Sequence, residues 1–424
     1  MSSRRFMPYP VYKDSGVEWL GEIPAGWEVK KLAWITKCLD GRRVPLNAEE
    51  RGRMQGEYPY WGANTIIDYV DRWLFDEDLV LLGEDGAPFF DRARSVAFHV
   101  NGKIWVNNHA HVLRPAPGVD PGFLAQVLNC VDYRAFIDGS TRDKLTQGDM
   151  NAIPIQYPQV SEQRAIAIFL DRETARIDAL VAKKERLLEL LHERRTALIT
   201  RAVTKGLDPN VPMKDSGVEW LGEIPGHWEV EENRWLFRES DVRSQLGEEE
   251  LLTVSHITGV TRRSEKPDVT MIEAESHEGY KVCGSGELAI NTMWAWMGAL
   301  GIAQEPGMVS PSYNVYRITS DRLVPHYYDY VCRIPLHVAE IIRHSKGIWQ
   351  SRLRLYPDAF RELLTPLPPI GEQRAIAAFL DRETASIDAL VAKIRTAIDR
   401  LKELRTALIS AAVTGKIDVR QEVA

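Results

Sequence analysis

The sequence predicts an α+β protein built from two globular domains and two long helices, arranged as an internal pseudo-twofold repeat. Three observations support this fold class. Apolar residues make up 44% and charged residues 27% of the 424 positions, the balance of a globular chain with enough apolar material for more than one core. Two different sequence blocks each occur twice. The second of these blocks has the apolar periodicity of a long helix, and we expect its two copies to form an antiparallel coiled coil between the domains.

The first repeated block is rich in aromatic and turn-forming residues. The segment KDSGVEWLGEIPAGWEV at residues 13–29 returns as KDSGVEWLGEIPGHWEV at residues 214–230, with 15 of 17 positions identical at an offset of 201. Trp34 and Trp235 extend the match at the same offset. We call these blocks the first and second frame segments. Their composition favours docking against a scaffold, so we interpret them as packing elements rather than as ligand sites.

The second repeated block predicts two helices of about 43 residues each. EQRAIAIFLDRETARIDALVAK at residues 162–183 returns at residues 372–393, with 20 of 22 positions identical at an offset of 210. Gly206 and Gly415 are suitable C-terminal stops. Apolar residues at spacings of four and three form a predicted seam: Ile166, Leu170, Ile177, Leu180, Leu187, Leu191 and Leu198 in the first helix, and Ile376, Leu380, Ile387, Leu390, Ile394, Leu401, Leu404 and Leu408 in the second.

Such a narrow apolar stripe needs a partner helix, and the two copies are natural partners for each other. The alternative is that each helix packs only on its own domain. A parallel pair would put both domains at one end, whereas an antiparallel pair creates a pseudo-twofold axis. A symmetric antiparallel register predicts that Glu383 lies beside Arg194 or Arg195 and that Glu173 lies beside Arg405.

Between the repeated blocks the two copies diverge almost completely. The predicted domain organisation is an N-terminal frame segment at 1–29, a first insert at 30–158, a central helix at 159–207, a linker with the second frame segment at 208–230, a second insert at 231–368 and a C-terminal helix at 369–424. Near-identical frames around different inserts indicate one task carried out on two different targets.

Two modules related by a twofold axis match the local symmetry of a DNA duplex, so the polar residues of the inserts are candidate DNA contacts. We expect Asn107, His109 and His111 to share one strand face, and Ser312 and Asn314 to share another. Asn, His and Ser on such faces can read base edges, and basic stretches can contact phosphates. The candidates are Asn64, Asn107, His109, His111, Arg142 and Lys144 in the first insert, and Asn291, Ser312, Asn314, Arg343, Lys346, Arg352 and Arg354 in the second. Ordinary sheet polarity and a solvated basic loop remain alternatives. His109 and His111 could also bind a metal, but no further His or Cys cluster completes such a site, and we expect none.

Several function classes are disfavoured by the composition. No apolar run is long enough to cross a bilayer, and no apolar stretch follows Arg4 and Arg5 as a signal peptide would require. The four cysteines are scattered, which is typical of reduced thiols in a cytoplasmic protein. The net charge of −7 means that DNA binding has to be argued locally. There is no [DN]-P-P-[FYW] motif and no phosphate-binding G-x-x-x-x-G-K-[ST] loop, so we expect no catalytic residues.

The chain resembles the specificity subunits of bacterial type I restriction–modification systems. The resemblance rests on the SGVEWLGEIPxxW segments and the EQRAIAxFLDRETxxIDALVAK helices. It extends to the lead-ins IPIQYPQVSEQ and LTPLPPIGEQ and to the helix ends RTALITRAVTKG and RTALISAAVTGK, and it therefore covers the whole chain.

The resemblance implies that residues 30–158 and 231–368 are target-recognition domains, each reading one half of a bipartite asymmetric target in double-stranded DNA. It also implies that the helices set the spacer and dock two methyltransferase subunits, and that restriction/translocase subunits complete the enzyme. S-adenosylmethionine, ATP and Mg would then be bound by those partners, and this chain would hold no cofactor and catalyse no reaction. Basic surfaces of the partners would offset its negative charge. The alternatives are a coiled-coil scaffold that binds only protein, and a stand-alone methyltransferase or nuclease with unrecognisable motifs.

Overall fold

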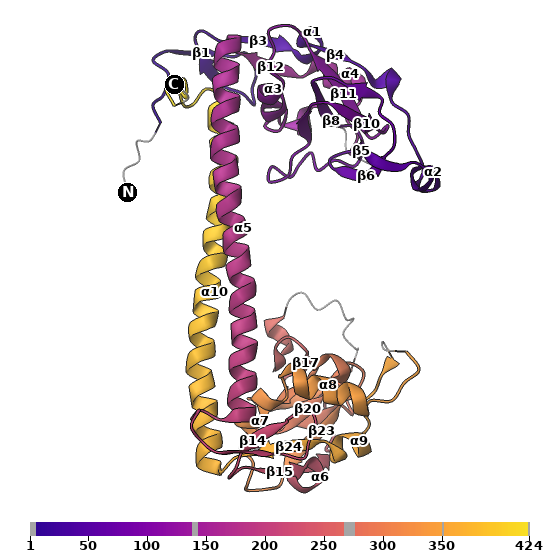
Figure 1. Cartoon of the computed structure of the whole chain (residues 1–424), viewed down its shortest axis with the longest axis vertical. Coiled ribbons are helices and arrows are strands. Elements are labelled where there is room, and N and C mark those ends of the chain that lie inside the picture. The colour runs from indigo at the N-terminus through magenta and orange to yellow at the C-terminus, as the bar shows by residue number, and fades with distance from the viewer. Residues whose placement is uncertain (1–5, 138–142, 267–275, 350–351, 423–424) are drawn as a thin grey trace. The chain divides into compact units, whose positions relative to one another are not determined.

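The computed structural model describes residues 6–137, 143–266, 276–349 and 352–422 and divides into two compact units. The first unit comprises Met1–Glu185 and Arg395–Ala424, and the second comprises Arg186–Ile394. This division crosses both long helices. Each unit therefore consists of one frame segment, one insert and parts of both helices (Figure 1).

The first unit contains four short helices and twelve strands among its described residues. In chain order these are β1 (Tyr12–Asp14), β2 (Glu22–Pro24), β3 (Glu28–Lys31), α1 (Leu32–Ile35), β4 (Thr36–Cys38), α2 (Ala48–Arg53), β5 (Gln55–Trp61), β6 (Ile66–Val70), β7 (Phe75–Asp76), β8 (Leu79–Gly83), β9 (Ala97–Val100), β10 (Lys103–Val106), β11 (Ala110–Pro115), α3 (Pro121–Leu128), α4 (Gln147–Ala152) and β12 (Pro154–Tyr157).

The centre of the first insert is an antiparallel sheet in the order β4-β11-β8-β9. Every residue of β8 is buried, as expected for a central strand covered on both faces. Helix α3 packs on β8 and β9, with the apolar side chains of Phe123, Leu124 and Val127 in the core. A second sheet, β6-β5-β10-β7, contains the parallel pair β10–β5.

The second unit repeats the central sheet of this plan with a different sequence, whereas its described residues form two-stranded sheets where the first unit has its second four-stranded sheet. Its elements before the last long helix are β13 (Met213–Asp215), β14 (Glu223–Pro225), β15 (Glu229–Glu232), α6 (Asn233–Leu236), β16 (Phe237–Ser240), β17 (Leu252–Ser255), β18 (Gly259–Arg262), β19 (Lys281–Cys283), β20 (Leu288–Ile290), β21 (Leu300–Ile302), β22 (Gly307–Val309), β23 (Asn314–Ile318), α7 (Pro325–Val331), α8 (Pro335–His344), α9 (Pro357–Glu362) and β24 (Leu364–Leu367). The central sheet β16-β23-β20-β21 has the same strand arrangement as its counterpart in the first unit. The two inserts therefore share a backbone framework despite their divergent sequences.

The two long helices are α5 (Val160–Lys205) and α10 (Ile370–Val413). Both end where the sequence predicts, because Gly206 and Gly415 each adopt φ of 73°, the left-handed conformation that stops a helix. The α+β class is confirmed. Neither long helix, nor any other described helix, combines the length and hydropathy of a bilayer-spanning segment.

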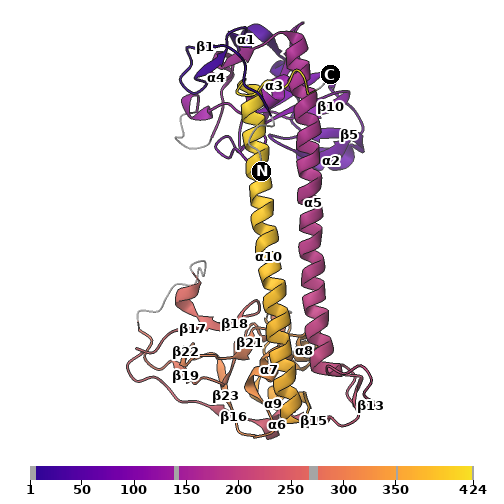
Figure 2. The same cartoon turned by 90° about the vertical axis from the view of Figure 1, so that its left-hand side faces the viewer.

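Within each unit the local stretches of α5 and α10 lie side by side and run antiparallel (Figure 2). In the first unit Asp178 pairs with Arg405 at 2.9 Å, and Glu162, earlier in α5, lies 3.9 Å from Arg420, later in the chain. In the second unit Arg195 lies 3.5 Å from Asp388. The two cross-helix pairs join the same residue types, since Asp178 and Asp388, like Arg195 and Arg405, are 210 positions apart.

The predicted register is wrong by more than one helical turn. Arg195 and Arg405 meet Asp388 and Asp178, not the predicted glutamates. Glu173 and Glu383 form ion pairs with the neighbouring arginines of their own helices. The physical reason is that the first turns of each helix are buried against its own insert, as Ile166 and Leu170 are in the first unit. The contact between the two helices therefore begins later in each helix than it would if their midpoints were paired.

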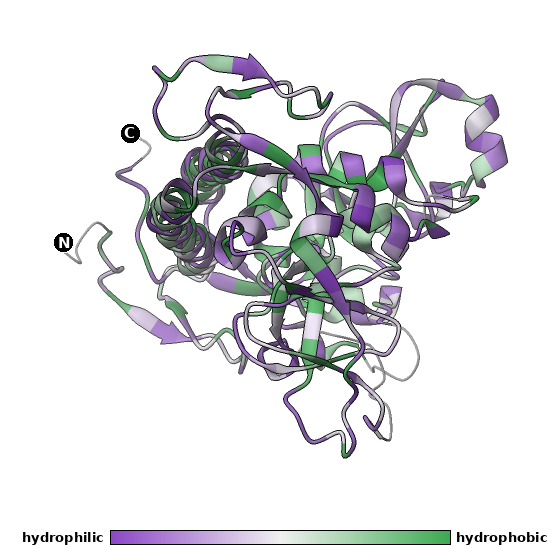
Figure 3. Cartoon of the chain, turned by 90° about the horizontal axis from the view of Figure 1, so that it is seen from below, coloured by the Kyte–Doolittle hydropathy of each residue, from purple (hydrophilic) through white to green (hydrophobic). Residues whose placement is uncertain are grey.

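The predicted apolar seam also needs correction. Ile166, Leu170, Ile177, Leu191, Ile376, Leu380, Ile387 and Ile394 are buried, and Leu198, Leu401 and Leu408 are partly buried. Leu180, Leu187, Leu390 and Leu404 are exposed in this chain, by 41% to 53%. A straight α-helix drifts by about 20° per heptad from a 3.5-residue repeat, so a strict seam rotates out of contact. Figure 3 shows hydrophobic and hydrophilic residues alternating around the turns of both helices.

This correction gives a matched pair of stability predictions in the second unit. Leu380→Ala removes a fully buried side chain, and we expect it to lower the free energy of unfolding by roughly 2–5 kcal/mol. Leu390→Ala removes a side chain that is 44% exposed, and we expect a loss below about 1 kcal/mol. Urea unfolding of the two variants measures the difference. Equal losses would contradict the placement of these helix faces.

The frame segments serve the packing role expected of them. Trp27 and Trp228 are fully buried, each in the core of its own unit. A Cβ placed on Gly415 would lie 3.1 Å from Trp27, and one placed on Gly206 would lie 3.3 Å from Trp228. Each frame segment therefore holds the C-terminal end of the long helix that comes from the other copy of the repeat.

A buried glutamine near the start of each long helix joins that helix to its insert. Gln163 accepts a hydrogen bond from the backbone N–H of Asp120 at 2.8 Å and donates to the carbonyls of Pro158 and Gly118. Gln373 accepts from the N–H of Val324 at 2.8 Å and donates to the carbonyls of Pro368 and Arg322. Every one of these partners is a main-chain atom. Both side chains are completely buried, so the bonds also satisfy polar groups that water cannot reach.

Candidate nucleic-acid interface

Three of the predicted DNA contacts gather at one depression on the first insert. Asn64 comes from the turn between β5 and β6, and Asn107 and His109 come from the turn between β10 and β11. The depression has a volume of about 520 Å³, and its remaining lining is Ala63, Thr65, Ile67, Asp85, Gly86, Ala87 and Asp143. Amides, an imidazole and carboxylates are all side chains that can bond to base edges.

The turn that carries Asn107 and His109 is fixed by its own hydrogen bonds. Oδ1 of Asn107 accepts from the N–H of His109 at 2.7 Å, and the N–H of Asn107 donates to the carbonyl of Trp61 at 3.0 Å. Nδ1 of His109 lies 3.7 Å from Oδ2 of Asp85, and the ring is 45% exposed. Asn107 and His109 therefore precede β11 rather than sharing a strand face with His111, which corrects that expectation.

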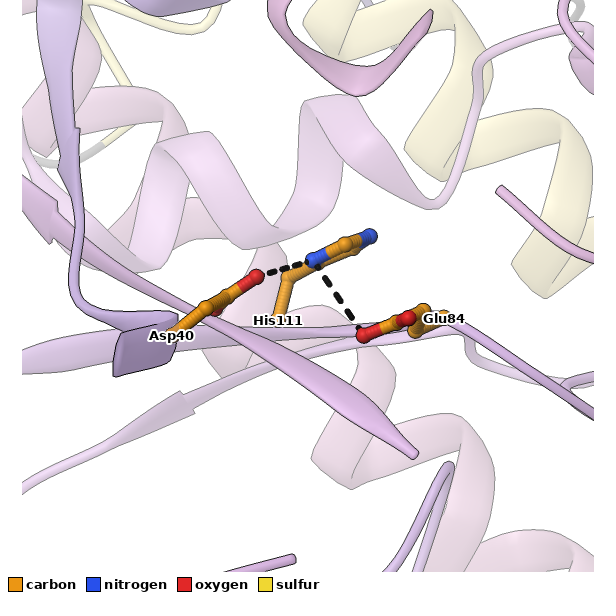
Figure 4. Close-up of side chains that lie close together, drawn as sticks. All are labelled: Asp40, Glu84 and His111. Atoms are coloured by element: carbon orange, nitrogen blue, oxygen red, sulfur yellow. Dashed lines mark hydrogen bonds and ion pairs between the residues drawn. The ribbon is translucent and has the colours of Figure 1, made fainter. Parts of the chain in front are cut away.

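His111 lies in the interior, so the prediction that it contacts DNA at the surface is wrong. Its side chain is 1% exposed, with Nδ1 2.6 Å from Oδ2 of Asp40 and Nε2 2.9 Å from the carbonyl of Leu145. Both ring nitrogens therefore have a polar partner within the insert. Figure 4 shows this ring with Asp40 and Glu84, whose Oε2 lies 3.7 Å from Nδ1. His111 therefore fixes the base of the insert and presents no surface to DNA.

Asp40, Glu84 and His111 are close enough together to hold a metal ion, but the surrounding charges fit a different role. Arg43 lies 2.7 Å from Glu84 and 3.3 Å from Asp40, and Lys144 lies 3.2 Å from Glu84. These cations already neutralise the two carboxylates. A further cation would have to displace them, so we interpret the cluster as a structural ion network.

The same network makes the first unit sensitive to acid. Burial alone would raise the pKa of Asp40, but hydrogen bonds from His111 and from the N–H of Val112 hold that pKa below its usual value. Burial likewise opposes the hydrogen bond from Arg43 that lowers the pKa of Glu84. A carboxyl with a lowered pKa in the folded state stabilises the fold above its unfolded pKa, about 4, and loses that contribution as the pH falls further.

We therefore expect the first unit to lose stability as the pH falls below about 4, and Asp40→Asn to flatten that pH dependence. The variant is also expected to be less stable at pH 7, because His111 and Arg43 each lose one of their two carboxylate neighbours and only Glu84 remains. Urea unfolding at pH 7, 5 and 3.5 measures both effects. An unchanged acid slope in the variant would contradict this role of Asp40.

The remaining predicted contacts of the first insert are basic. Lys144 is 53% exposed on its side chain but already pairs with Glu84. Arg142 lies outside the described residues.

In the second insert, two of the three predicted base-reading residues donate hydrogen bonds to tyrosine hydroxyls. Asn291 is buried and donates to the hydroxyl of Tyr313 at 2.9 Å, which corrects its expected exposure. Asn314, at the start of β23, is half-buried and donates to the hydroxyl of Tyr316 at 3.2 Å. Ser312 is exposed in the preceding turn, so it does not share the strand face predicted for it.

In the predicted basic stretch of the second insert, one cation is paired with carboxylates and three are exposed. Arg343, on α8, is already paired with Glu340 at 2.7 Å and with Glu219 at 3.3 Å. Lys346, Arg352 and Arg354 are exposed. The backbones of Lys346 and Arg354 exchange two hydrogen bonds of 3.0 Å, which closes a short hairpin.

This hairpin carries two apolar side chains that the sequence analysis did not single out. Ile348 is 93% exposed and Trp349 is 69% exposed. Apolar residues inside an otherwise basic stretch were the signal that could have identified them.

Comparisons with known proteins agree on one family. Residues 24–190 match the family described as the type I restriction modification DNA specificity domain. The chain is 32% identical over 175 residues to a putative type I restriction enzyme specificity subunit of Haemophilus influenzae, a match that spans 41% of this chain and 42% of that protein. It is 22% identical to the EcoDI specificity subunit of Escherichia coli over 94% of this chain and 90% of that protein.

The fold is similar to solved structures over almost the whole chain. A chain from a structure of a type I R-M system matches with a TM-score of 0.63 at 16% identity, covering 92% of this chain and 98% of that one. The HsdS subunit of Thermoanaerobacter tengcongensis matches with a TM-score of 0.51 at 16% identity, covering 93% and 98%. At this level of identity the likeness concerns the fold.

Proposed function

Because the chain belongs to the family of type I restriction–modification specificity subunits, we propose that each of its inserts reads one half of a bipartite asymmetric DNA target. The observation that carries this proposal is the pair of near-identical frames around inserts that share a sheet framework but not a sequence. Different side chains on a common framework give two different half-sites. The chain itself is not an enzyme, in keeping with its specificity-subunit relatives.

In the first insert, the proposed reading site is the depression lined by Asn64, Asn107 and His109. Amide and imidazole groups can donate to and accept from base edges, while Asp85 and Asp143 can accept from the amino groups of adenine or cytosine. Acidic residues would repel phosphates, so this surface suits bases better than backbone.

In the second insert, the proposed phosphate contact is the hairpin that carries Lys346, Arg352 and Arg354. These cations are exposed, and two backbone hydrogen bonds between Lys346 and Arg354 hold those two residues side by side. Trp349 and Ile348 add an apolar surface that can pack on a sugar or an exposed base.

We further propose that α5 and α10 set the spacer between the half-sites and dock two methyltransferase subunits. Restriction/translocase subunits would complete the assembly in the cytoplasm. S-adenosylmethionine, ATP and Mg would be bound by these partners, and this chain would supply only the recognition of the target sequence.

Exchange of one insert tests this function. Replacing residues 30–158 with the corresponding insert of a relative is expected to change one half of the target and leave the other half intact, because the hydrogen bonds of Gln163 to the insert involve only main-chain atoms, which a relative's insert also supplies. Mapping methylated adenines in cells that carry the chain and its methyltransferase measures the target. A change in both halves would contradict the modular assignment, and methylation without sequence preference would favour a protein-only scaffold.

A further inference from the structure

The frame region contains three tryptophans that occur in both copies, and one pair differs from the other two. Trp27 and Trp228 are buried, and Trp19 and Trp220 are half-buried within their units. Trp34 is 70% exposed and Trp235 is 68% exposed. The third pair therefore has equal exposure in both copies and little packing of its own.

The short helices around this pair explain how the exposure arises. In α1, Leu32 and Ile35 point into the core and are buried, which places Trp34 on the outer side of the turn. In α6, Asn233 and Leu236 are buried in the same way around Trp235. The ammonium of Lys31 lies 6.0 Å from the ring centroid of Trp34, the outer limit for a cation–π contact.

The residues beside the pair have changed while the tryptophan has not. Between positions 30–38 and 231–239, which read KKLAWITKC and EENRWLFRE, the tryptophan is the only identical residue. The three lysines of the first stretch are replaced by two glutamates and one arginine, and the second stretch has a further arginine and a further glutamate where the first has Ala33 and Cys38. The shared feature is therefore an exposed aromatic surface and not a pattern of charge.

We propose that Trp34 and Trp235 are the anchors by which two identical methyltransferase subunits dock, one on each copy of the frame. This inference rests on the proposed function, which provides a partner present twice. An identical exposed aromatic residue in two otherwise different surroundings fits a partner that binds twice through the same pocket. Tryptophan is enriched among the residues that dominate binding energy in protein interfaces.

Charge argues against DNA as the occupant of these two positions. Three glutamates and two arginines flank Trp235 in the sequence, so the net charge of that stretch is negative and does not favour phosphates. Three lysines and no acid flank Trp34 over the matching positions, so a DNA contact would be expected in one copy only. A protein pocket that takes an indole ring tolerates both surroundings, because rim charges contribute little to affinity.

Native mass spectrometry of the full chain with its methyltransferase, together with titration of the affinity, tests the proposal. Trp34→Ala and Trp235→Ala should each leave one strongly bound methyltransferase, and the double variant should bind both copies at least about 30-fold more weakly. Trp34→Phe should retain part of the affinity. Trp294→Ala is the matched control, since Trp294 is 52% exposed but has no tryptophan counterpart in the other copy, and its complex should keep two methyltransferases.

The outcomes separate this inference from the proposed function. A double variant that binds two methyltransferases with unchanged affinity would overturn the anchoring role while leaving the proposed function intact. Variants that assemble normally but lose DNA affinity would also overturn it, in favour of a DNA contact. A native chain that binds no methyltransferase at all would overturn the proposed function itself.

Discussion

A chain that stops after the first long helix, at residue 207, is expected to form a symmetric homodimer. In the second unit, Ile199, Ala202 and Val203 of α5 pack into the core beside Trp228. In the first unit, the residues 210 positions later, Ile409, Ala412 and Val413 of α10, pack into the core beside Trp27. Because the two frame segments are nearly identical, the end of one α5 can take the place of α10 against the frame of a second copy.

The ion pairs between the helices point to the same dimer. Asp178 of α5 pairs with Arg405 in the first unit, and Arg195 of α5 pairs with Asp388 in the second. Arg405 and Asp388 are the repeats of Arg195 and Asp178, so two α5 helices in the same register would form two Asp178–Arg195 pairs. These pairs are partly exposed and contribute mainly to register, while the apolar helix ends supply most of the affinity.

Light scattering and sedimentation measure the mass of residues 1–207. We expect a dimer, and with the methyltransferase present we expect methylation of a symmetric target made of two inverted copies of the first half-site. Val203→Asp is the control, because Val203 belongs to the core of the second unit and not of the first. It should give a monomer with unchanged far-ultraviolet circular dichroism. A monomeric native fragment would contradict the interchangeability of the two helix ends.

Lengthening both long helices by four residues is expected to widen the gap in the target without altering its halves. Insertions after Lys184 and after Ile398 lie between the two ion pairs on both helices, so both pairs can still form. Four helical residues add about 6 Å, close to two base-pair rises of about 3.4 Å. We therefore expect a gap that is roughly two base pairs longer.

An insertion in only one helix provides the control for this experiment. It shifts Asp178–Arg405 and Arg195–Asp388 out of a common register, so we expect weaker assembly and lower methylation rather than a new gap. The target is again read from the methylated adenines. An unchanged gap in an active, doubly extended protein would contradict the idea that the helices set the spacer.

The repeats were the most predictive feature of the sequence, and contacts across long sequence distances were the least. Identity at fixed offsets predicted the frames, the helices and their ends at Gly206 and Gly415, because these follow from local patterns. The burial of His111 could not be predicted in this way. Its partner Asp40 is 71 residues away, and strand alternation does not reveal which face another segment covers.

The helix register failed for a related reason. Periodicity identified a seam, but it did not reveal that the first turns of each helix are used by its own insert. The charged residues on the seam then suggested glutamate partners for Arg195 and Arg405, whereas the aspartates five residues further along are the residues that meet them. Among the candidate site residues, sequence reasoning placed Asn64, Asn107 and His109 in one region but could not show that they line one depression.

The glutamine joints at the start of α5 and α10 have a consequence for the evolution of this chain. Gln163 and Gln373 bond only to peptide N–H and C=O groups, which any insert supplies whatever its side chains are. A gene segment encoding a foreign insert can therefore enter by recombination within the repeated blocks and keep these hydrogen bonds, as long as its apolar side chains still pack on the first turns of the long helix. Selection then acts on the new target alone, and recognition can diversify in single genetic exchanges rather than through a series of compensating mutations.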